Sequence, residues 1–384
     1  MVKAIYLDYN GTTPHDPEVI AAMRPFLEEE FGNPSSGHLY AAMPRQALKT
    51  ARRQVAGLLN CAPEEVVFTS GGTEANNWAI IGTAIALRDR GRHIITSSFE
   101  HPAVLNVCHF LEKEGYEVTY LPVDAQGIVG VADVEAALRP DTTLVTIMHA
   151  NNEVGSIQPI AEIASLAKSR GIRVHSDAAQ SLGKIPVDVK ELEIDLLSMA
   201  GHKLYAPKGV GALYIRSGVR LETFMHGAGQ EMRRRAGTEN ILEIVGLGKA
   251  CEIAARNLEH NRRHMQAMRD RLHAAITAGV KEVRLNGHAE KRLPNTLSLS
   301  FRNMEANRIL EAIGMEIAAS AGAACHADSV EISHVLKAMG VPIEWAKGTL
   351  RLTTGRMTTA PEIDRAATLI VEAVNKIRKC RKGI

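Results

Sequence analysis

The chain contains few cysteines, and their spacing suits neither a disulfide framework nor a metal-binding motif. The five residues are Cys61, Cys108, Cys251, Cys325 and Cys380, an odd number scattered over 384 residues. Disulfide-stapled domains have paired cysteines at close spacing, and zinc sites typically use CxxC pairs. We therefore expect free thiols in a reducing cytoplasm and no resident metal ion.

Long apolar runs and a strong net charge are also missing. No stretch reaches the roughly 20 apolar residues that a membrane-spanning helix needs, and residues 1–14 lack the apolar core of a signal peptide. The formal net charge is only +2, so no strong field attracts the chain to nucleic acid or to an anionic membrane. The composition therefore predicts a globular protein with neither kind of partner.

Alternating strand and helix patterns fill most of the chain. Amphipathic helical patterns, for example at 74–88, 102–114 and 160–170, separate most of the apolar, β-branched segments that are typical of buried strands. The seven strand candidates lie at 65–69, 92–96, 117–121, 143–148, 173–176, 195–198 and 210–215. This alternation predicts an α/β fold whose mostly parallel sheet is covered by helices on both faces.

A long charged helix is predicted at 239–278, and its length suggests a bridge out of the large domain. Strand-like residues 295–301 and several helical patterns follow it, which is typical of a smaller α+β domain. A break near Pro14 suggests that the N-terminus joins this smaller domain. The predicted division is a large cofactor-binding domain at 15–258 and a small domain, carrying the Cys325 loop, made of 1–14 and 259–384.

Polar residues gather where the predicted strands end, which is the edge where α/β sheets bind ligands. The first group, 69–77, reads Thr-Ser-Gly-Gly-Thr-Glu-Ala-Asn-Asn and joins a strand to a helix. Backbone N–H groups at such a helix start bind anions such as phosphate, and Thr73 can add a hydroxyl. An ordinary capping turn, with Thr73 as the N-cap, is the alternative interpretation.

Asp177 and Lys203 follow two other predicted strands. An acid at the end of a buried strand needs a cationic partner, which is either a structural ion pair or the pyridinium nitrogen of a cofactor such as pyridoxal phosphate (PLP). A crowded lysine at the same edge has a lowered pKa and can form an imine. The alternative for Lys203 is a surface lysine. Lys208 competes for the role, but its Pro-Lys-Gly turn suits an exposed side chain.

Cys325 lies in a run of mostly small residues, 318–329, that would make a poor core and a good mobile loop. A loop thiol beside His326 can be reactive, because a nearby imidazole favours the thiolate. A buried structural cysteine is the alternative, and we assign that role to the other four cysteines. Taken together, the four groups would supply a phosphate cradle, a pyridinium partner, an imine lysine and a thiol nucleophile.

At these residues the chain resembles the class V aminotransferase-type PLP enzymes and, within them, the cysteine desulfurases of the NifS/IscS kind. The resemblance runs nearly end to end, and it implies the type I fold of PLP-dependent transferases, with a seven-stranded sheet and PLP as the cofactor. The motifs that carry it are Tyr6-Leu-Asp-Tyr-Asn-Gly-Thr-Thr-Pro, Gly32-Asn-Pro-Ser-Ser, Thr69-Ser-Gly-Gly-Thr-Glu, Glu100-His-Pro-Ala-Val, His149-Ala-Asn-Asn-Glu-Val-Gly, His175-Ser-Asp-Ala-Ala-Gln, Gly201-His-Lys, Arg235-Ala-Gly-Thr-Glu-Asn and Arg351-Leu-Thr-Thr-Gly-Arg.

The resemblance implies a role for each cofactor-binding residue. Lys203 would carry PLP as a Schiff base, His101 would stack on its ring and transfer protons, and Asp177 would pair with the ring nitrogen. Gln180 would bond to the phenolic oxygen, and Thr238 would reach the phosphate from a partner subunit, which implies a homodimer. The full implied set is Gly72, Thr73, His101, Asn152, Asp177, Gln180, His202, Lys203 and Thr238.

The substrate is implied in the same way. Arg351 would bind the carboxylate of L-cysteine with help from Asn33, and Asn152 would orient the substrate. Lys203, His101 and Cys325 would be the catalytic residues. Cys325 would take the substrate sulfur as a persulfide and pass it to an iron–sulfur scaffold or another acceptor protein. That Cys325 also lends a transient ligand to a cluster is a further hypothesis.

Three departures from the family pattern leave alternatives open. Ala200 replaces a frequent serine before the imine lysine, so one phosphate hydroxyl is lost, and Ala228 stands where the family prefers glycine. Ala323-Ala-Cys-His differs from the usual Ser-Ala-Cys form, and with Val341-Pro it is similar to selenocysteine lyases. The alternatives are therefore a selenocysteine lyase, a C–S lyase or aminotransferase without a persulfide, and an inactive scaffold.

Overall fold

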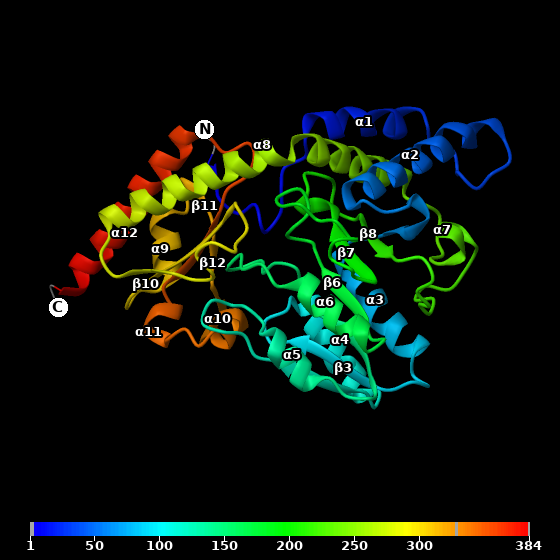
Figure 1. Ribbon diagram of the computed structural model, residues 1–384. Coiled ribbons are helices and arrows are strands. Elements are labelled where there is room, and N and C mark those ends of the chain that lie inside the picture. The colour runs from blue at the N-terminus through cyan, green and yellow to red at the C-terminus, as the bar shows by residue number, and fades with distance from the viewer. Residues whose placement is uncertain (1–3, 327–328, 383–384) are drawn as a thin grey trace.

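The computed structural model describes residues 4–326 and 329–382, which form two halves joined by one long helix, α8 (Ile241–Gly279) (Figure 1). Helices α1 (Pro17–Glu28) and α2 (Ala42–Leu59) pack on α8 in one half, and α12 (Ala360–Lys382) packs on it in the other. The chain crosses between the halves along α8 and also in the segment that precedes α1. No helix in the described part is both long and apolar enough to cross a membrane.

A seven-stranded sheet forms the centre of the larger half. Its strands have entirely buried residues except in β4 and at Arg173 of β6, and burial on both faces is typical of parallel sheets. Only β8 runs antiparallel to its neighbours. In spatial order the strands are β2 (Val66–Thr69), β8 (Gly211–Ile215), β7 (Leu196–Ala200), β6 (Arg173–Asp177), β5 (Thr142–Thr146), β3 (His93–Ser97) and β4 (Glu117–Leu121).

Helices cover both faces of this sheet, because each face carries its own apolar cluster. Residues of α2, α6 (Ile160–Ser169) and α8 pack with one face in the largest cluster. Helices α3 (Gly72–Ala86) and α4 (Pro102–Lys113) cover the other face in two smaller clusters. The sheet is therefore the middle layer of three, as the alternating sequence pattern predicts.

The smaller half is built around an antiparallel sheet and a separate apolar cluster. The N-terminal strand β1 (Ile5–Tyr6) pairs with β11 (Ile317–Ala318), so the first residues of the chain lie in this half. The antiparallel sheet has the order β12 (Ser320–Ala321), β15 (Thr349–Thr353), β10 (Thr296–Phe301) and β9 (Val283–Leu285). The exact domain boundaries stay a prediction.

Short elements complete the chain. Strands β13 (Ala323–His326) and β14 (Ser329–Ile332) form an antiparallel hairpin that carries Cys325. The remaining helices are α5 (Val131–Ala137), α7 (Gln230–Arg233), α9 (Ala306–Ile313), α10 (His334–Ala338) and α11 (Ile343–Ala346). All seven predicted strands of the central sheet are present.

Candidate active site

A cavity of about 270 Å³ lies at the end of the central sheet where β6 and β7 finish. Strand ends, the start of α3 and the N-terminal segment after β1 all contribute to its walls. Nine of the residues that the sequence places in the site line it together: Gly72, Thr73, His101, Asn152, Asp177, Gln180, His202, Lys203 and Arg351. The other lining residues are Asn10, Gly11, Asn76, Ala103, Met148, Ala150, Ala179 and Ala200.

The turn before α3 forms a cradle for an anion. Gly71 has a φ of +150°, which suits glycine, and the helix begins at Gly72. The first N–H groups of a helix lack intrahelical partners, so those at Gly72 and Thr73 are available as donors. A Cβ at Gly72 would lie 3.2 Å from the Cβ of Ala200, so glycine keeps this wall open.

Asp177 is held at the end of β6 by two donors. The Asn76 amide nitrogen lies 2.6 Å from Oδ2, and the backbone N–H of Ala179 lies 2.9 Å from Oδ1. Asp177 is 7% exposed and has no ion pair within the described residues. A buried carboxylate held in this way on a cavity wall is ready to pair with a cation in the cavity.

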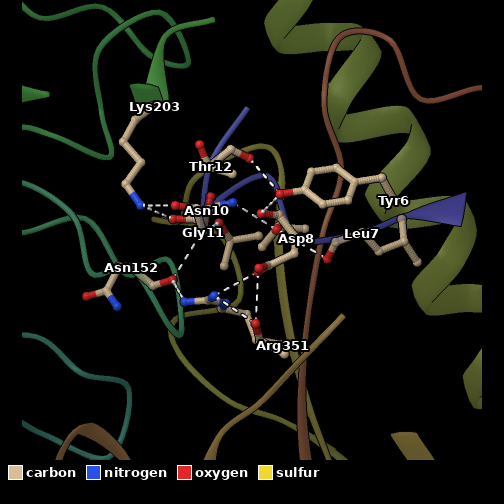
Figure 2. A network of polar contacts seen from close by, with 12 residues as sticks. Tyr6, Leu7, Asp8, Asn10, Gly11, Thr12, Asn152, Lys203 and Arg351 are labelled. Carbon is tan, nitrogen blue, oxygen red and sulfur yellow. Dashed lines mark hydrogen bonds and ion pairs between the residues drawn. The ribbon is translucent and has the colours of Figure 1, made fainter. Parts of the chain in front are cut away.

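Lys203 enters the cavity from a short 3₁₀ turn, Gly201–Lys203, after β7. Its Nζ donates to the backbone carbonyls of Asn10 at 2.5 Å and Gly11 at 2.6 Å (Figure 2). Burial, followed by the charge of Arg351, lowers the pKa of Lys203 to about 8, although Asp8 and Asp177 oppose the shift. The neutral, nucleophilic form of the Lys203 amine is therefore far more populated near neutral pH than that of an ordinary lysine.

The two histidines of the cavity are held in defined orientations. His101 caps α4, and its Nδ1 accepts the N–H of Ala103 at 3.1 Å, which leaves Nε2 to carry the proton. Burial is the largest cause of its lowered pKa, and Lys203 acts in the same direction. His202 contacts the Thr12 hydroxyl at 3.2 Å, and burial beside lysines lowers its pKa to about 4. We infer that His202 is neutral and able to share one N–H with an anion.

Arg351 lies on β15 and reaches the cavity from the smaller half (Figure 2). Its Nη2 contacts Asp8 Oδ1 at 2.8 Å and Ser320 Oγ at 3.1 Å, and Nη1 donates to the Asn152 carbonyl at 3.3 Å. The buried Nε atom has no hydrogen-bond partner among the residues that the structure describes. This guanidinium therefore has donor capacity left for a carboxylate, which it can bind with two hydrogen bonds.

Three predicted site residues do not line this cavity in the single chain. Asn33 lies in the exposed loop before α2, where its Oδ1 accepts the N–H of Ser35. Thr238 lines a different cavity with Ser70 and Arg235. The backbone of Cys325 lies in β13, opposite Val330, and its side chain lies outside the described part of the structure. Their roles stay predictions.

Several residues of the site were not identified from sequence reasoning. Asn10 and Gly11 lie within the first quoted motif, but nothing in the sequence predicted that their carbonyls meet Lys203. Asn76 lies three residues after Thr73, and this helical spacing places both on one face of α3. That spacing could have identified Asn76 from the sequence. The pairing of Asp8 with Arg351 could not be identified in this way, because the two residues are 343 positions apart.

The structure also shows what surrounds position 200, where this chain has alanine in place of the serine that is frequent in the family. Ala200 lines the cavity, whereas the Ser198 hydroxyl bonds to Nε2 of His175 at 2.9 Å. Ser198 and His175 are both fully buried within the sheet. The Ser198 hydroxyl is therefore not available to the turn before α3 in place of the hydroxyl that a serine at position 200 would carry.

Comparison with known proteins gives consistent results. Residues 5–366 match the model of the family described as aminotransferase class-V. A relative described as cysteine desulfurase IscS from Methanosarcina thermophila is 48% identical over 377 residues, which are 98% of this chain and 93% of the relative. The solved structure of a NifS-like protein has a TM-score of 0.92 at 37% identity and covers 97% of this chain and all of its own. The solved structure of SspA in complex with cysteine has a TM-score of 0.81 at 38% identity, over 92% of this chain and 99% of that one.

Proposed function

Because the chain belongs to the class-V aminotransferase family, we propose that it is a cysteine desulfurase, which converts L-cysteine to L-alanine and takes up the sulfur on Cys325. The family and its relatives confirm the predicted fold class and the predicted PLP cofactor. One observation carries the proposal at residue level: a single cavity brings together Lys203, Asp177, His101 and Arg351.

The walls of the cavity fit PLP. Gly72, Thr73 and neutral His202 present donors suited to its phosphate, and Asp177 presents a carboxylate suited to the pyridinium nitrogen. When bound to Lys203, PLP supplies an electron sink that stabilises negative charge at the substrate Cα. The phosphate, the ring nitrogen and the aldehyde carbon of the cofactor would thus each have a complementary group on this chain.

The chain's own residues can then carry the reaction. Arg351 binds the substrate carboxylate and so orients the Cα–H bond. The Lys203 amine, once free, accepts the Cα proton. The Cys325 thiolate attacks the substrate sulfur, forming an S–S bond while the bond between sulfur and Cβ breaks and leaves its electron pair with the carbon skeleton. One proton delivered to Cβ and one returned to Cα complete alanine. The sulfur remains bound to Cys325 as a persulfide.

The partners follow from the same proposal. Asn33 and Thr238 lie outside the cavity of their own chain, so we propose a homodimer in which Thr238 of each subunit reaches the phosphate of the other. A persulfide on Cys325 needs a second protein as acceptor, for which we propose an iron–sulfur scaffold or another sulfur carrier. The free thiols suit a reducing cytoplasm.

Mass spectrometry after treatment with L-cysteine tests the proposal. We expect an added mass of about 32 Da, one sulfur atom, on the peptide that contains Cys325. Cys325→Ser should abolish both the adduct and alanine formation, whereas Cys380→Ser should leave both unchanged. Full turnover of L-cysteine by Cys325→Ser would indicate a C–S lyase or aminotransferase without a persulfide. Turnover of selenocysteine alone would indicate a selenocysteine lyase.

A further inference from the structure

Lys184 is a buried lysine that the reaction outlined above does not use. It lies in the turn segment after β6, is 4% exposed, and forms no ion pair with a carboxylate among the described residues. Burial, with Lys203 and Arg351 nearby, holds the pKa of Lys184 well below its ordinary value. A buried amine without a carboxylate is unfavourable unless hydrogen bonds compensate it, so its contacts are informative.

Two side-chain amide oxygens surround the Lys184 amine. Its Nζ lies 2.8 Å from Gln180 Oε1 and 3.2 Å from Asn10 Oδ1. Gln180 lines the cofactor cavity, and Lys184 does not. Any influence of Lys184 on the cavity through these contacts therefore passes through Gln180 and Asn10.

The orientation of both amides is fixed by backbone carbonyls at their other ends. Gln180 Nε2 donates to the carbonyl of Asn10 at 3.1 Å, and Asn10 Nδ2 donates to the carbonyl of Asn152 at 3.0 Å. A carbonyl can only accept, so each amide must turn its nitrogen toward it and its oxygen toward Lys184. The amine has at least two hydrogens, whether protonated or neutral, and it donates one to each oxygen.

This arrangement determines what Gln180 can offer the cavity. One hydrogen of its NH₂ group bonds to Asn10, and the second is free for an acceptor in the cavity. A flipped amide would set its NH₂ group against the hydrogens of Lys184. Lys184 therefore opposes the flip and keeps a donor, rather than an acceptor, available to the phenolic oxygen of PLP.

We propose that Lys184 is a positioning residue that holds the Gln180 amide as a hydrogen-bond donor toward the phenolic oxygen of the cofactor. The inference rests on the proposed function and deepens it. A donor at that oxygen weakens the attraction between the oxygen and the protonated imine nitrogen of Lys203. Loss of the donor should therefore raise the pH at which this imine loses its proton.

The test uses the cofactor-loaded protein without cysteine. For Lys184→Met we expect the pH midpoint of the visible absorbance change to rise by about one unit, the order expected for one hydrogen bond to a charged group. Lys184→Gln, which keeps an N–H donor without the charge, should shift it less. Lys190→Met, an exposed lysine six residues on, is the matched control and should leave the midpoint unchanged.

Gln180→Leu separates positioning from a direct charge effect. If Lys184 acts through Gln180, adding Lys184→Met to Gln180→Leu should cause no further shift. Additive shifts, or unchanged midpoints in both Lys184 variants, would overturn the inference. Neither result would contradict the proposed function, because cysteine turnover by the parent protein is measured separately. A parent protein that binds no visible chromophore would instead overturn the proposed function, and this inference with it.

Discussion

The amide nitrogen of Asn76 lies 2.6 Å from Oδ2 of Asp177, and both side chains are buried in the wall of the cavity. Asn76 comes from the first turns of α3, and Asp177 from the end of β6. The contact therefore ties the helix that starts at the proposed phosphate cradle to the carboxylate that we propose as the partner of the pyridinium nitrogen. In the proposed site, the groups that hold the two ends of the cofactor would therefore be joined by this one hydrogen bond.

Asn76→Ala should weaken the site without unfolding the protein. A hydrogen bond to a charged group contributes about 1.5–3 kcal/mol, which corresponds to about a tenfold to hundredfold loss of PLP affinity or of kcat/KM. Equilibrium dialysis of PLP and steady-state kinetics with L-cysteine would measure the loss. Asn77→Ala is the matched control, because within the described part of the chain the Asn77 side chain donates to the Thr73 carbonyl of its own helix and not to Asp177. Equal behaviour of the two variants would contradict the positioning role of Asn76.

Arg351→Lys should raise KM for L-cysteine more than it lowers kcat. Lysine keeps the charge but loses the planar pair of N–H donors that binds a carboxylate with two hydrogen bonds. A tenfold to hundredfold rise in KM corresponds to about 1.4–3 kcal/mol of lost binding. Arg365→Lys, in an exposed ion pair with Glu316, is the control and should leave KM unchanged. A purely kcat effect would place Arg351 outside substrate binding.

The sequence predicted the fold well because its signals are local and repeated. Each strand of the central sheet is a short β-branched run between turn residues, so the seven strands and the long helix near 239–278 were predicted at nearly their observed positions. Burial on both faces leaves such runs little freedom to form anything else. The cavity residues Asp177 and Lys203 followed from the same logic, since both lie at strand ends.

The residues that could not be predicted from the sequence contact partners that are far away along the chain. Asp8 meets Arg351, and Asn10 meets Lys203, only because β1 pairs with β11 in the smaller half and brings the N-terminal segment to the cavity. No periodic pattern encodes such a contact. Lys184 was missed for another reason: within one sequence, a buried lysine looks the same as an exposed one.

Capture of PLP by the cofactor-free protein should become faster as the pH rises through about 8, be half-maximal there, and level off at higher pH. The neutral Lys203 amine is the reacting form, and its pKa is lowered to about 8. Stopped-flow absorbance would follow the capture. Lys203→Ala should form no borohydride-reducible adduct, whereas Lys208→Ala, an exposed lysine in the next turn, should behave like the parent. Adduct formation by Lys203→Ala would transfer the role to another lysine.

The same lowered pKa has a consequence for stability. An unfolded chain holds the Lys203 proton up to its ordinary pKa of 10.5, whereas the folded chain releases it near 8. Between these values the unfolded state binds more protons, so this residue makes the free energy of unfolding rise with pH. Denaturant titrations of the cofactor-free protein at pH 8 and 10 would measure the rise. The rise should be smaller in Lys203→Met, and an equal rise would assign the effect to other groups.

Ala200→Ser should tighten PLP binding. Ala200 lines the cavity beside Gly72, and the Ser198 hydroxyl is hydrogen-bonded to His175. The proposed phosphate cradle therefore has no hydroxyl at position 200. A new hydroxyl that donates to the phosphate should contribute about 1–2 kcal/mol, or roughly five- to thirtyfold in the dissociation constant. Serine adds one atom to alanine and keeps the buried strand compatible with its neighbours. The dissociation constant, measured by fluorescence titration with PLP, should fall, and pyridoxal without phosphate should show no gain. An equal gain with pyridoxal would mean that the added hydroxyl contacts the ring and not the phosphate.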